Sequence, residues 1–256
     1  MKIRILGAHN TESKSTGCAC LLIDDVLALD AGSLTSKLSF KAQGKIKSVL
    51  LTHRHYDHIK DLLALAMNFY LRGKSLELCA LPSFFNDLAP DLQNEALYPN
   101  FAQRPPQKPT FRLNVVTPGR ELSVLEYKVL PVAVNHTVPT VGYQITSPGG
   151  QKVFYTSDTG PGLSECWRQV SPDLLIIEVT YINKYSQLSI EVGHLTPSLL
   201  KTELESFRRL KGYLPRVVTV HASPIKEKVL DAEIAAVAGA LKADIQPGRE
   251  GMRINL

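Results

Sequence analysis

Residues 52–58 of the chain read Thr-His-Arg-His-Tyr-Asp-His and follow a short apolar run at 48–51. With this composition, three histidines and one aspartate in that pattern are expected by chance in roughly one protein in a few thousand. The apolar run predicts a buried strand, and apolar residues after the string recur at helical spacing, so the string lies at a strand-to-helix junction. Imidazole and carboxylate groups that converge at such a turn suit Zn, Fe, Mn or Ni. The string therefore predicts part of a metal site.

The other ligands must come from distant parts of the chain, because one short string cannot fill a coordination shell. His136, Asp158 and His221 each stand just past the end of an apolar, strand-like run. Ligand groups of α/β folds gather at the carboxyl ends of strands. We therefore expect these three side chains to complete the site. The lack of a thiolate near it argues against a closed structural zinc site.

The apolar runs predict an α/β fold, with sheets buried under helices. Runs bounded by turn residues indicate strands at 3–6, 19–23, 26–28, 47–51, 76–80, 111–116, 124–134, 142–146, 153–156, 174–179 and 217–220. Apolar spacing and capping residues indicate helices at 59–71, 197–210 and 225–241. Strands alternate with helices in both halves, and no repeat or Gly- or Ser-rich linker divides the chain. We expect one domain over residues 1–256.

Composition sets wider limits. The chain has 256 residues, of which 44% are apolar, and a net charge of 29 − 24 = +5. That charge permits an anionic substrate or a nucleic acid without requiring either. Four cysteines exclude a disulfide scaffold, and no apolar run reaches the roughly 18 residues of a membrane span. The first residues lack the apolar core of a signal peptide and predict a strand. We expect a cytoplasmic protein with no membrane partner.

The least regular part of the sequence is 83–110. Prolines stand at 82, 90, 99, 105, 106 and 109. They predict that no long helix or central strand forms there. The stretch is either a surface connection or a lid over the site, since long irregular loops in compact domains are often functional.

At these residues the chain resembles the metallo-beta-lactamase superfamily of metal-dependent hydrolases. The matching pieces are Asp30-Ala31-Gly32, the string at 53–58, His136, Asp158 within 155–159, and His221, in the order of that family. The resemblance implies an αββα four-layer sandwich with a dinuclear site between the two sheets. It implies that His53, His55 and His136 hold one divalent metal ion, that Asp57, His58 and His221 hold the other, and that Asp158 bridges them. Zinc is the first expectation, with manganese or iron as alternatives.

Three segments resemble the phosphodiesterase branch of that superfamily, namely RNase Z-type tRNA 3′-processing endonucleases and class II cyclic-nucleotide phosphodiesterases. They are 136–143, 178–181 and 193–197, the last reading Gly-His-Leu-Thr-Pro. The RNase Z type carries a tRNA-binding arm between the third histidine and the bridging aspartate. Here only 158 − 136 − 1 = 21 residues separate His136 from Asp158, too few for an arm. A small phosphodiester is therefore the expected substrate, and nucleic acid is left open as an alternative. A homodimer is also left open.

Asp57 and His194 are the candidate catalytic residues. Two metals would bridge a hydroxide that attacks phosphorus, and the leaving alkoxide needs a proton. His194 stands just before a helix predicted to begin near Thr196 and Pro197, whose N-terminus favours an anion. We expect His194 either to supply that proton or to bind the phosphate.

Three more residues are candidates for supporting roles. Asp30 and Glu178 are expected to orient ligand imidazoles through their free ring nitrogens, as metal sites usually require. Asp30 is equally suited to holding a tight turn with Gly32. His9, in the loop after the first strand, is expected at the rim of the site, either in contact with substrate or simply exposed.

Several functions remain open from sequence alone. The same hydroxide would open a lactone, a thioester or a beta-lactam, and an RNase Z-like nuclease would act on nucleic-acid 3′ ends. The segment 193–197 favours a phosphodiesterase over a hydrolase of a lactone, a thioester or a beta-lactam. A diiron redox protein is disfavoured, because such relatives typically have a glutamate where His55 stands. A non-catalytic metal-binding module is disfavoured by retention of every ligand type.

Overall fold

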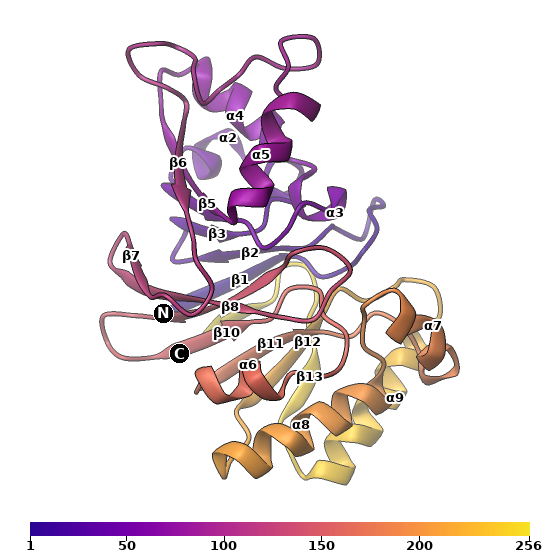
Figure 1. The fold of residues 1–256 in the computed structure, drawn as a ribbon. Coiled ribbons are helices and arrows are strands. Elements are labelled where there is room, and N and C mark those ends of the chain that lie inside the picture. The colour runs from indigo at the N-terminus through magenta and orange to yellow at the C-terminus, as the bar shows by residue number, and fades with distance from the viewer.

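Two seven-stranded sheets face each other in the computed structural model, which describes residues 1–256 apart from the side chains of 88 and 89 (Figure 1). One group of helices covers the outer face of the first sheet and another covers the outer face of the second. This arrangement confirms the predicted αββα fold class.

The first sheet is built almost entirely from the N-terminal half. Its strands, in spatial order, are β14 (Arg253–Asn255), β1 (Lys2–Gly7), β2 (Cys20–Ile23), β3 (Leu27–Leu29), β4 (Ser48–Leu50), β5 (Leu76–Ala80) and β6 (Phe111–Val115). Strands β3 to β6 run parallel. The helices of this half are α1 (Leu34–Lys37), α2 (Phe40–Gln43), α3 (Tyr56–Ile59), α4 (Leu62–Tyr70) and α5 (Pro82–Asp91).

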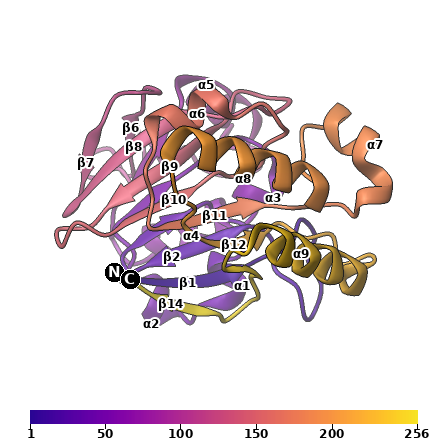
Figure 2. The same cartoon turned by 90° about the horizontal axis from the view of Figure 1, so that it is seen from below.

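The second sheet comes from the rest of the chain. Its order is β13 (Ile245–Pro247), β12 (Arg216–Val220), β11 (Leu174–Glu178), β10 (Lys152–Tyr155), β9 (Val141–Thr146), β8 (Tyr127–Ala133) and β7 (Leu122–Val124). Its helices are α6 (Ser164–Gln169), η1 (Asn183–Tyr185), α7 (Ser186–Glu191), α8 (Pro197–Lys211) and α9 (Glu227–Leu241). Figure 2 shows α8 and α9 side by side on the outside of the sandwich. Within the described residues, no helix is both long and apolar enough to cross a membrane.

The strands are apolar on both faces because both faces are covered. In β2, Leu21 and Ile23 pack into the central core between the sheets, whereas Cys20 and Leu22 pack under the helices of the first half. Successive side chains of a strand point to opposite faces, so a strand buried on both sides needs a continuous apolar run. Such runs are what made the central strands predictable.

Some predicted boundaries were wrong. The single strand predicted at 124–134 is a hairpin of β7 and β8, which turns at Leu125 with a φ of +55°. The helix predicted at 59–71 is divided into α3 and α4. A ten-residue helix, α5, forms at the start of the stretch where the prolines predicted no long helix. Pro82 occupies its first position, where the missing N–H costs no hydrogen bond, and Pro90 lies in its last turn.

The parallel strands bring the candidate residues to one edge of the sandwich. Strands β3 and β4 of the first sheet and β8, β10, β11 and β12 of the second all end there. The loops that leave these strands carry the residues named above, so two half-sites from different sheets meet at this edge.

Candidate metal centre

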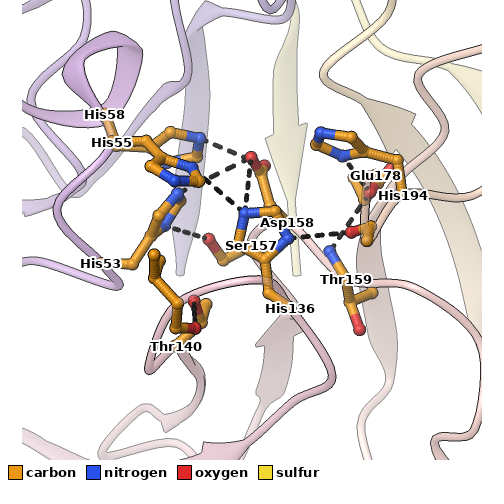
Figure 3. A network of polar contacts seen from close by, with 12 residues as sticks. His53, His55, His58, His136, Thr140, Ser157, Asp158, Thr159, Glu178 and His194 are labelled. Carbon is orange, nitrogen blue, oxygen red and sulfur yellow. Dashed lines mark hydrogen bonds and ion pairs between the residues drawn. The ribbon is translucent and has the colours of Figure 1, made fainter. Parts of the chain in front are cut away.

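The structure brings all seven predicted ligands together. Figure 3 shows five of them, His53, His55, His58, His136 and Asp158. The string leaves β4 and enters α3, and the three distant residues follow β8, β10 and β12. Three groups have ligand atoms that all lie within 4.8 Å of one another, and one of them is Glu178, His194 and His221. The other two groups contain the seven predicted ligands. They are His53, His55, His136 and Asp158, called here the first group, and Asp57, His58, Asp158 and His221, the second group.

Asp158 lies between the two groups. Its Oδ2 is 3.7 Å from His53 Nε2 and 3.9 Å from His136 Nε2. Its Oδ1 is 3.1 Å from His58 Nε2 and 3.4 Å from His221 Nε2. Each carboxylate oxygen therefore faces one group, which is the arrangement that a bridging ligand needs.

The second group is closed by Asp57, at the start of α3. Its Oδ2 is 3.0 Å from His221 Nε2 and 3.7 Å from His58 Nε2. The two groups thus differ in chemistry. The first offers three imidazoles and one carboxylate oxygen, and the second offers two of each.

Buried atoms without partners show that a cation fits this site. Among the described residues, six buried side-chain nitrogen or oxygen atoms make no hydrogen bond, and three of them are His53 Nε2, His58 Nε2 and Asp158 Oδ1. A buried polar atom left unsatisfied costs about 1–3 kcal/mol. All three belong to the two groups, and imidazole with carboxylate is a donor set for divalent transition metals. Bound cations would satisfy all three atoms.

The protonation states of the first group also suit a cation. Burial, reinforced by the neighbouring His58, holds the pKa of His53 well below its usual range. Burial lowers the pKa of His55 and His136 as well. Burial alone would raise the pKa of Asp158, but the charges of His221 and His58 outweigh it and hold that pKa well below its usual range. Neutral imidazoles and an ionised carboxylate are the forms that bind metal.

Asp30 has the position expected of a residue that orients an imidazole. It is fully buried, and its Oδ2 lies 2.8 Å from His58 Nδ1 and accepts from the Tyr155 hydroxyl at 3.0 Å. With the carboxylate as acceptor, Nδ1 of His58 carries the proton and Nε2 presents its lone pair to the second group. Asp30 also has a φ of +59°, so it shapes the turn after β3 as well.

Two hydroxyl groups that the sequence did not single out support the first group. The Oγ1 of Thr52 donates to Asp30 and lies 3.0 Å from His53 Nδ1. The Ser157 hydroxyl donates to Thr52 at 2.7 Å. Because the one hydroxyl proton of Thr52 goes to Asp30, its oxygen accepts from Nδ1 of His53 and leaves Nε2 free.

Two of the three remaining ligand imidazoles, those of His136 and His221, are held in the same way. His136 Nδ1 lies 2.9 Å from the carbonyl oxygen of Gly193. His221 Nδ1 lies 2.8 Å from Oγ1 of Thr180, whose proton goes to Glu178. Thr180 is also a residue that the sequence did not indicate, although it lies in the segment 178–181.

The position of Glu178 differs from the prediction that it orients a ligand imidazole. It does not contact a ligand imidazole directly. Its Oε1 lies 2.7 Å from Nδ1 of His194, and its Oε2 accepts from the backbone N–H of Leu195. It reaches His221 only through Thr180.

His194 is held at the edge of the second group. Its ring stacks on that of His221, with centroids 5.3 Å apart, and its side chain is 14% exposed. Burial alone would lower its pKa, but the charge and hydrogen bond of Glu178 outweigh burial and raise that pKa to about 9. A protonated imidazole therefore stands beside the metal-binding groups at neutral pH.

His9 also differs from the prediction. Its side chain is 3% exposed. Its Nδ1 lies 2.6 Å from Glu250 and its Nε2 lies 3.1 Å from Glu227. Because it is buried and both ring nitrogens are engaged, it is neither exposed nor free to bind a substrate.

Two grooves flank α5 beside the site. One is lined by Tyr56, Ile59 and Phe84. Tyr56 stands between two predicted ligands in the sequence and is 69% exposed. An ion pair between Arg54 and Asp87 joins the string to α5 along this groove. The other groove is lined by His136 and the residues after it, and by the start of α5. The irregular segment 83–110 thus begins next to the site.

The chain is similar in sequence to known proteins. A profile of the Beta-lactamase superfamily domain matches residues 21–222. A 3′,5′-cyclic-nucleotide phosphodiesterase from Aliivibrio fischeri is 24% identical over 208 residues, which are 73% of this chain and 61% of that protein. A ribonuclease Z from Methanopyrus kandleri is 30% identical over 127 residues, which are 48% of this chain and 40% of that protein. The chain thus spans less than two thirds of either relative.

The fold is also similar to solved structures. The structure of unliganded yeast PDE1 matches 100% of this chain and 99% of that chain with a TM-score of 0.85. The sequences are 17% identical, so this likeness concerns the fold.

Proposed function

The chain belongs to the beta-lactamase superfamily, as its motifs predicted, and from this we propose that it is a dinuclear-metal-dependent phosphodiesterase. The proposed substrate is a cyclic nucleotide or another small phosphodiester. The observation that carries the proposal is the pairing of His194 with the buried Glu178 beside the second group. That pair supplies what a phosphodiester reaction needs beyond a metal site, namely a proton for the leaving alkoxide.

Each residue has a part in this proposal. When bound, two divalent cations supply a water nucleophile at neutral pH and neutralise charge on the phosphoryl oxygens. The seven ligands would hold the cations, and each oxygen of Asp158 would serve one group. His194 donates its proton to the leaving oxygen, while Glu178 keeps that imidazole charged and oriented. An imidazolium at this position also attracts the phosphate anion.

A small substrate is favoured over transfer RNA. The residues between His136 and Asp158 are taken up mainly by β9 and β10, which pair in the second sheet. They leave no insertion for an RNA-binding arm. The A. fischeri relative is a cyclic-nucleotide phosphodiesterase by name, and its match covers more of this chain than the ribonuclease Z match. We propose zinc as the metal and the cytoplasm as the location.

Metal removal and a substrate panel test the proposal. Purified protein is expected to hydrolyse an aryl phosphodiester and a 3′,5′-cyclic nucleotide, to lose both activities on chelation, and to regain them with Zn²⁺ or Mn²⁺. A lactone, a thioester, a beta-lactam and an RNA with a 3′ extension serve as competing substrates. Turnover of one of these without turnover of either phosphodiester would replace the proposed function.

The role of Glu178 is tested by Glu178→Gln. In metal-free protein, the pKa of His194 is expected to fall from about 9 to about 6.5 or below, because burial then acts with less opposition. The imidazolium, which is the proton donor, exists below this pKa, so the variant loses it at a lower pH than the wild type.

An NMR titration of the histidine rings from pH 5 to pH 10 measures this pKa. Glu203→Gln is a matched control, because Glu203 is also a buried carboxylate but accepts from Gly162, Leu163 and Trp167 instead of a histidine. If His194 still titrates near 9 in Glu178→Gln, Glu178 is not what keeps it protonated.

A further inference from the structure

The segment between β13 and β14 crosses from one sheet to the other. Strand β13 pairs with β12 in the second sheet, and β14 pairs with β1 in the first. Glu250 lies in this crossover. Its side chain is turned toward the loop between β1 and β2, residues 8–19, which is called here the N-terminal loop.

One oxygen of Glu250 closes the base of the N-terminal loop. Oε1 accepts from the backbone N–H groups of Ala8 at 3.1 Å and Gly17 at 2.8 Å, which stand near opposite ends of the loop. The same oxygen lies 2.6 Å from Nδ1 of His9. Burial alone would raise the pKa of Glu250, but the hydrogen bond with His9 and those from the two amides lower it to about 2. Glu250 is therefore an ionised group with three donors on one oxygen.

His9 connects this carboxylate to a second one. Its Nε2 lies 3.1 Å from Glu227, the first residue of α9. Burial alone would lower the pKa of His9, but Glu250 and Glu227 outweigh burial and raise it. Arg249 lies 3.4 Å from Glu227 and 2.5 Å from Asp231. The crossover, the N-terminal loop and α9 are thus joined by one charge network, which is buried at His9 and partly exposed at Arg249.

This network borders directly on a predicted ligand. Ala222, the residue after His221, donates to the carbonyl oxygen of Ala8 and accepts from the N–H of Asn10. His221 itself has a φ of +62°, a conformation that a residue other than glycine adopts only where its surroundings impose it. The two residues on either side of His9 therefore hold the backbone that fixes His221.

The other side of the N-terminal loop reaches the rest of the second group. Glu12 pairs with Lys60, two residues after His58, at 3.1 Å. The first group is fixed by other contacts, namely those of Thr52 with His53 and of Gly193 with His136. The contacts of the network and its loop therefore lead to one metal-binding group.

We propose that Glu250 and His9 are positioning residues for the second group, holding His221 where a divalent cation requires it. Removing either one weakens cation binding by Asp57, His58, Asp158 and His221 and leaves the first group unchanged. The proposal rests on the proposed function only in requiring that two cations bind, and it is tested without any substrate.

Titration of metal-free protein with ¹¹³Cd²⁺, followed by ¹¹³Cd NMR, tests it. The wild type is expected to give two signals, because one group offers three nitrogens and the other offers two. His55→Ala and His221→Ala assign the signals to the first and second groups. In Glu250→Ala the Kd of the second group is expected to rise at least tenfold, with that of the first group within twofold of wild type.

Asp24 offers a matched control. It also joins the sheets through hydrogen bonds, accepting from the N–H of Lys2 at 2.8 Å and from the Tyr127 hydroxyl at 2.6 Å. It lies in the turn before β3, at the end of the sandwich opposite the site. Asp24→Ala is expected to lower stability and to leave both cadmium signals and both affinities unchanged.

The outcomes separate clearly. Glu250→Gln retains an acceptor for the two amides and loses the charge opposite His9. It is therefore expected to raise the cadmium Kd of the second group about threefold. This variant decides the question if Glu250→Ala does not fold. Wild-type affinity in the Gln variant then overturns the proposal. Equal weakening of both groups, or a wild type that binds fewer than two cadmium ions, also overturns it. Two bound ions without phosphodiester hydrolysis would instead contradict the proposed function alone.

Discussion

Asp158→Asn is expected to lower kcat/KM for a cyclic-nucleotide phosphodiester at least about a thousandfold, the scale of loss seen when a group acting directly on the reaction is removed. Bound metal is expected to fall from two ions per chain to one or none. The two oxygens of Asp158 face different groups, and an amide keeps one oxygen without the charge. A cation bound by the buried His58 and His221 then lacks the negative charge that Asp158 supplies.

The measurement combines steady-state kinetics with metal analysis of the same sample. Asp173→Asn is a suitable control, because Asp173 accepts the backbone N–H of Lys152 at the other end of β10. That variant is expected to keep both metals and full activity. Full metal content and near wild-type kcat/KM in Asp158→Asn would show that Asp158 does not bridge.

His194→Ala is expected to lower kcat for the same cyclic nucleotide by about a hundredfold to a thousandfold, within the range for loss of a general acid. The metal content is expected to stay at two, because all seven ligands remain. The effect depends on the leaving group. A nitrophenolate leaves without a proton, so kcat for a nitrophenyl phosphodiester is expected to fall less than tenfold in this variant. That smaller loss is the part of the effect that proton transfer does not explain.

The comparison of these two substrates separates the two roles considered for His194. A large loss confined to the alkoxide leaving group identifies a proton donor. An equal loss for both substrates, with a raised KM, identifies a phosphate-binding residue instead. Wild-type kinetics on both would remove His194 from the mechanism.

The sequence predicted which seven residues come together, because its signals are local and rare. The string at 53–58 stands out by its composition, and His136, Asp158 and His221 follow apolar runs that are long enough to recognise as strands. Continuous apolar runs also predicted the two covered sheets, since a strand buried on both faces has no other pattern.

The supporting residues could not be predicted to the same extent. Thr52 and Thr180 are hydroxyl residues beside predicted ligands, and only the fold shows that each accepts from an imidazole. Glu178 was expected to orient a ligand and instead pairs with His194, because the partner depends on how two loops meet. His9 was expected at the rim and is buried by Glu250, which is 241 residues away.

Short elements were missed for a related reason. Strands β13 and β14 have three residues each, too few to show a period. The turn at Leu125 has no Gly or Asn to indicate a positive φ, so β7 and β8 appeared as one strand. At Pro82 the residue type favoured a break, whereas its position at the first turn of α5 favours a helix.

Titration of metal-free protein with Zn²⁺, followed by hydrolysis of a 3′,5′-cyclic nucleotide at each step, tests the dinuclear site most directly. Activity is expected to be absent without metal and to reach its maximum only when two ions are bound per chain. Full activity with one ion or none, or no hydrolysis with two ions bound, would contradict a dinuclear phosphodiesterase.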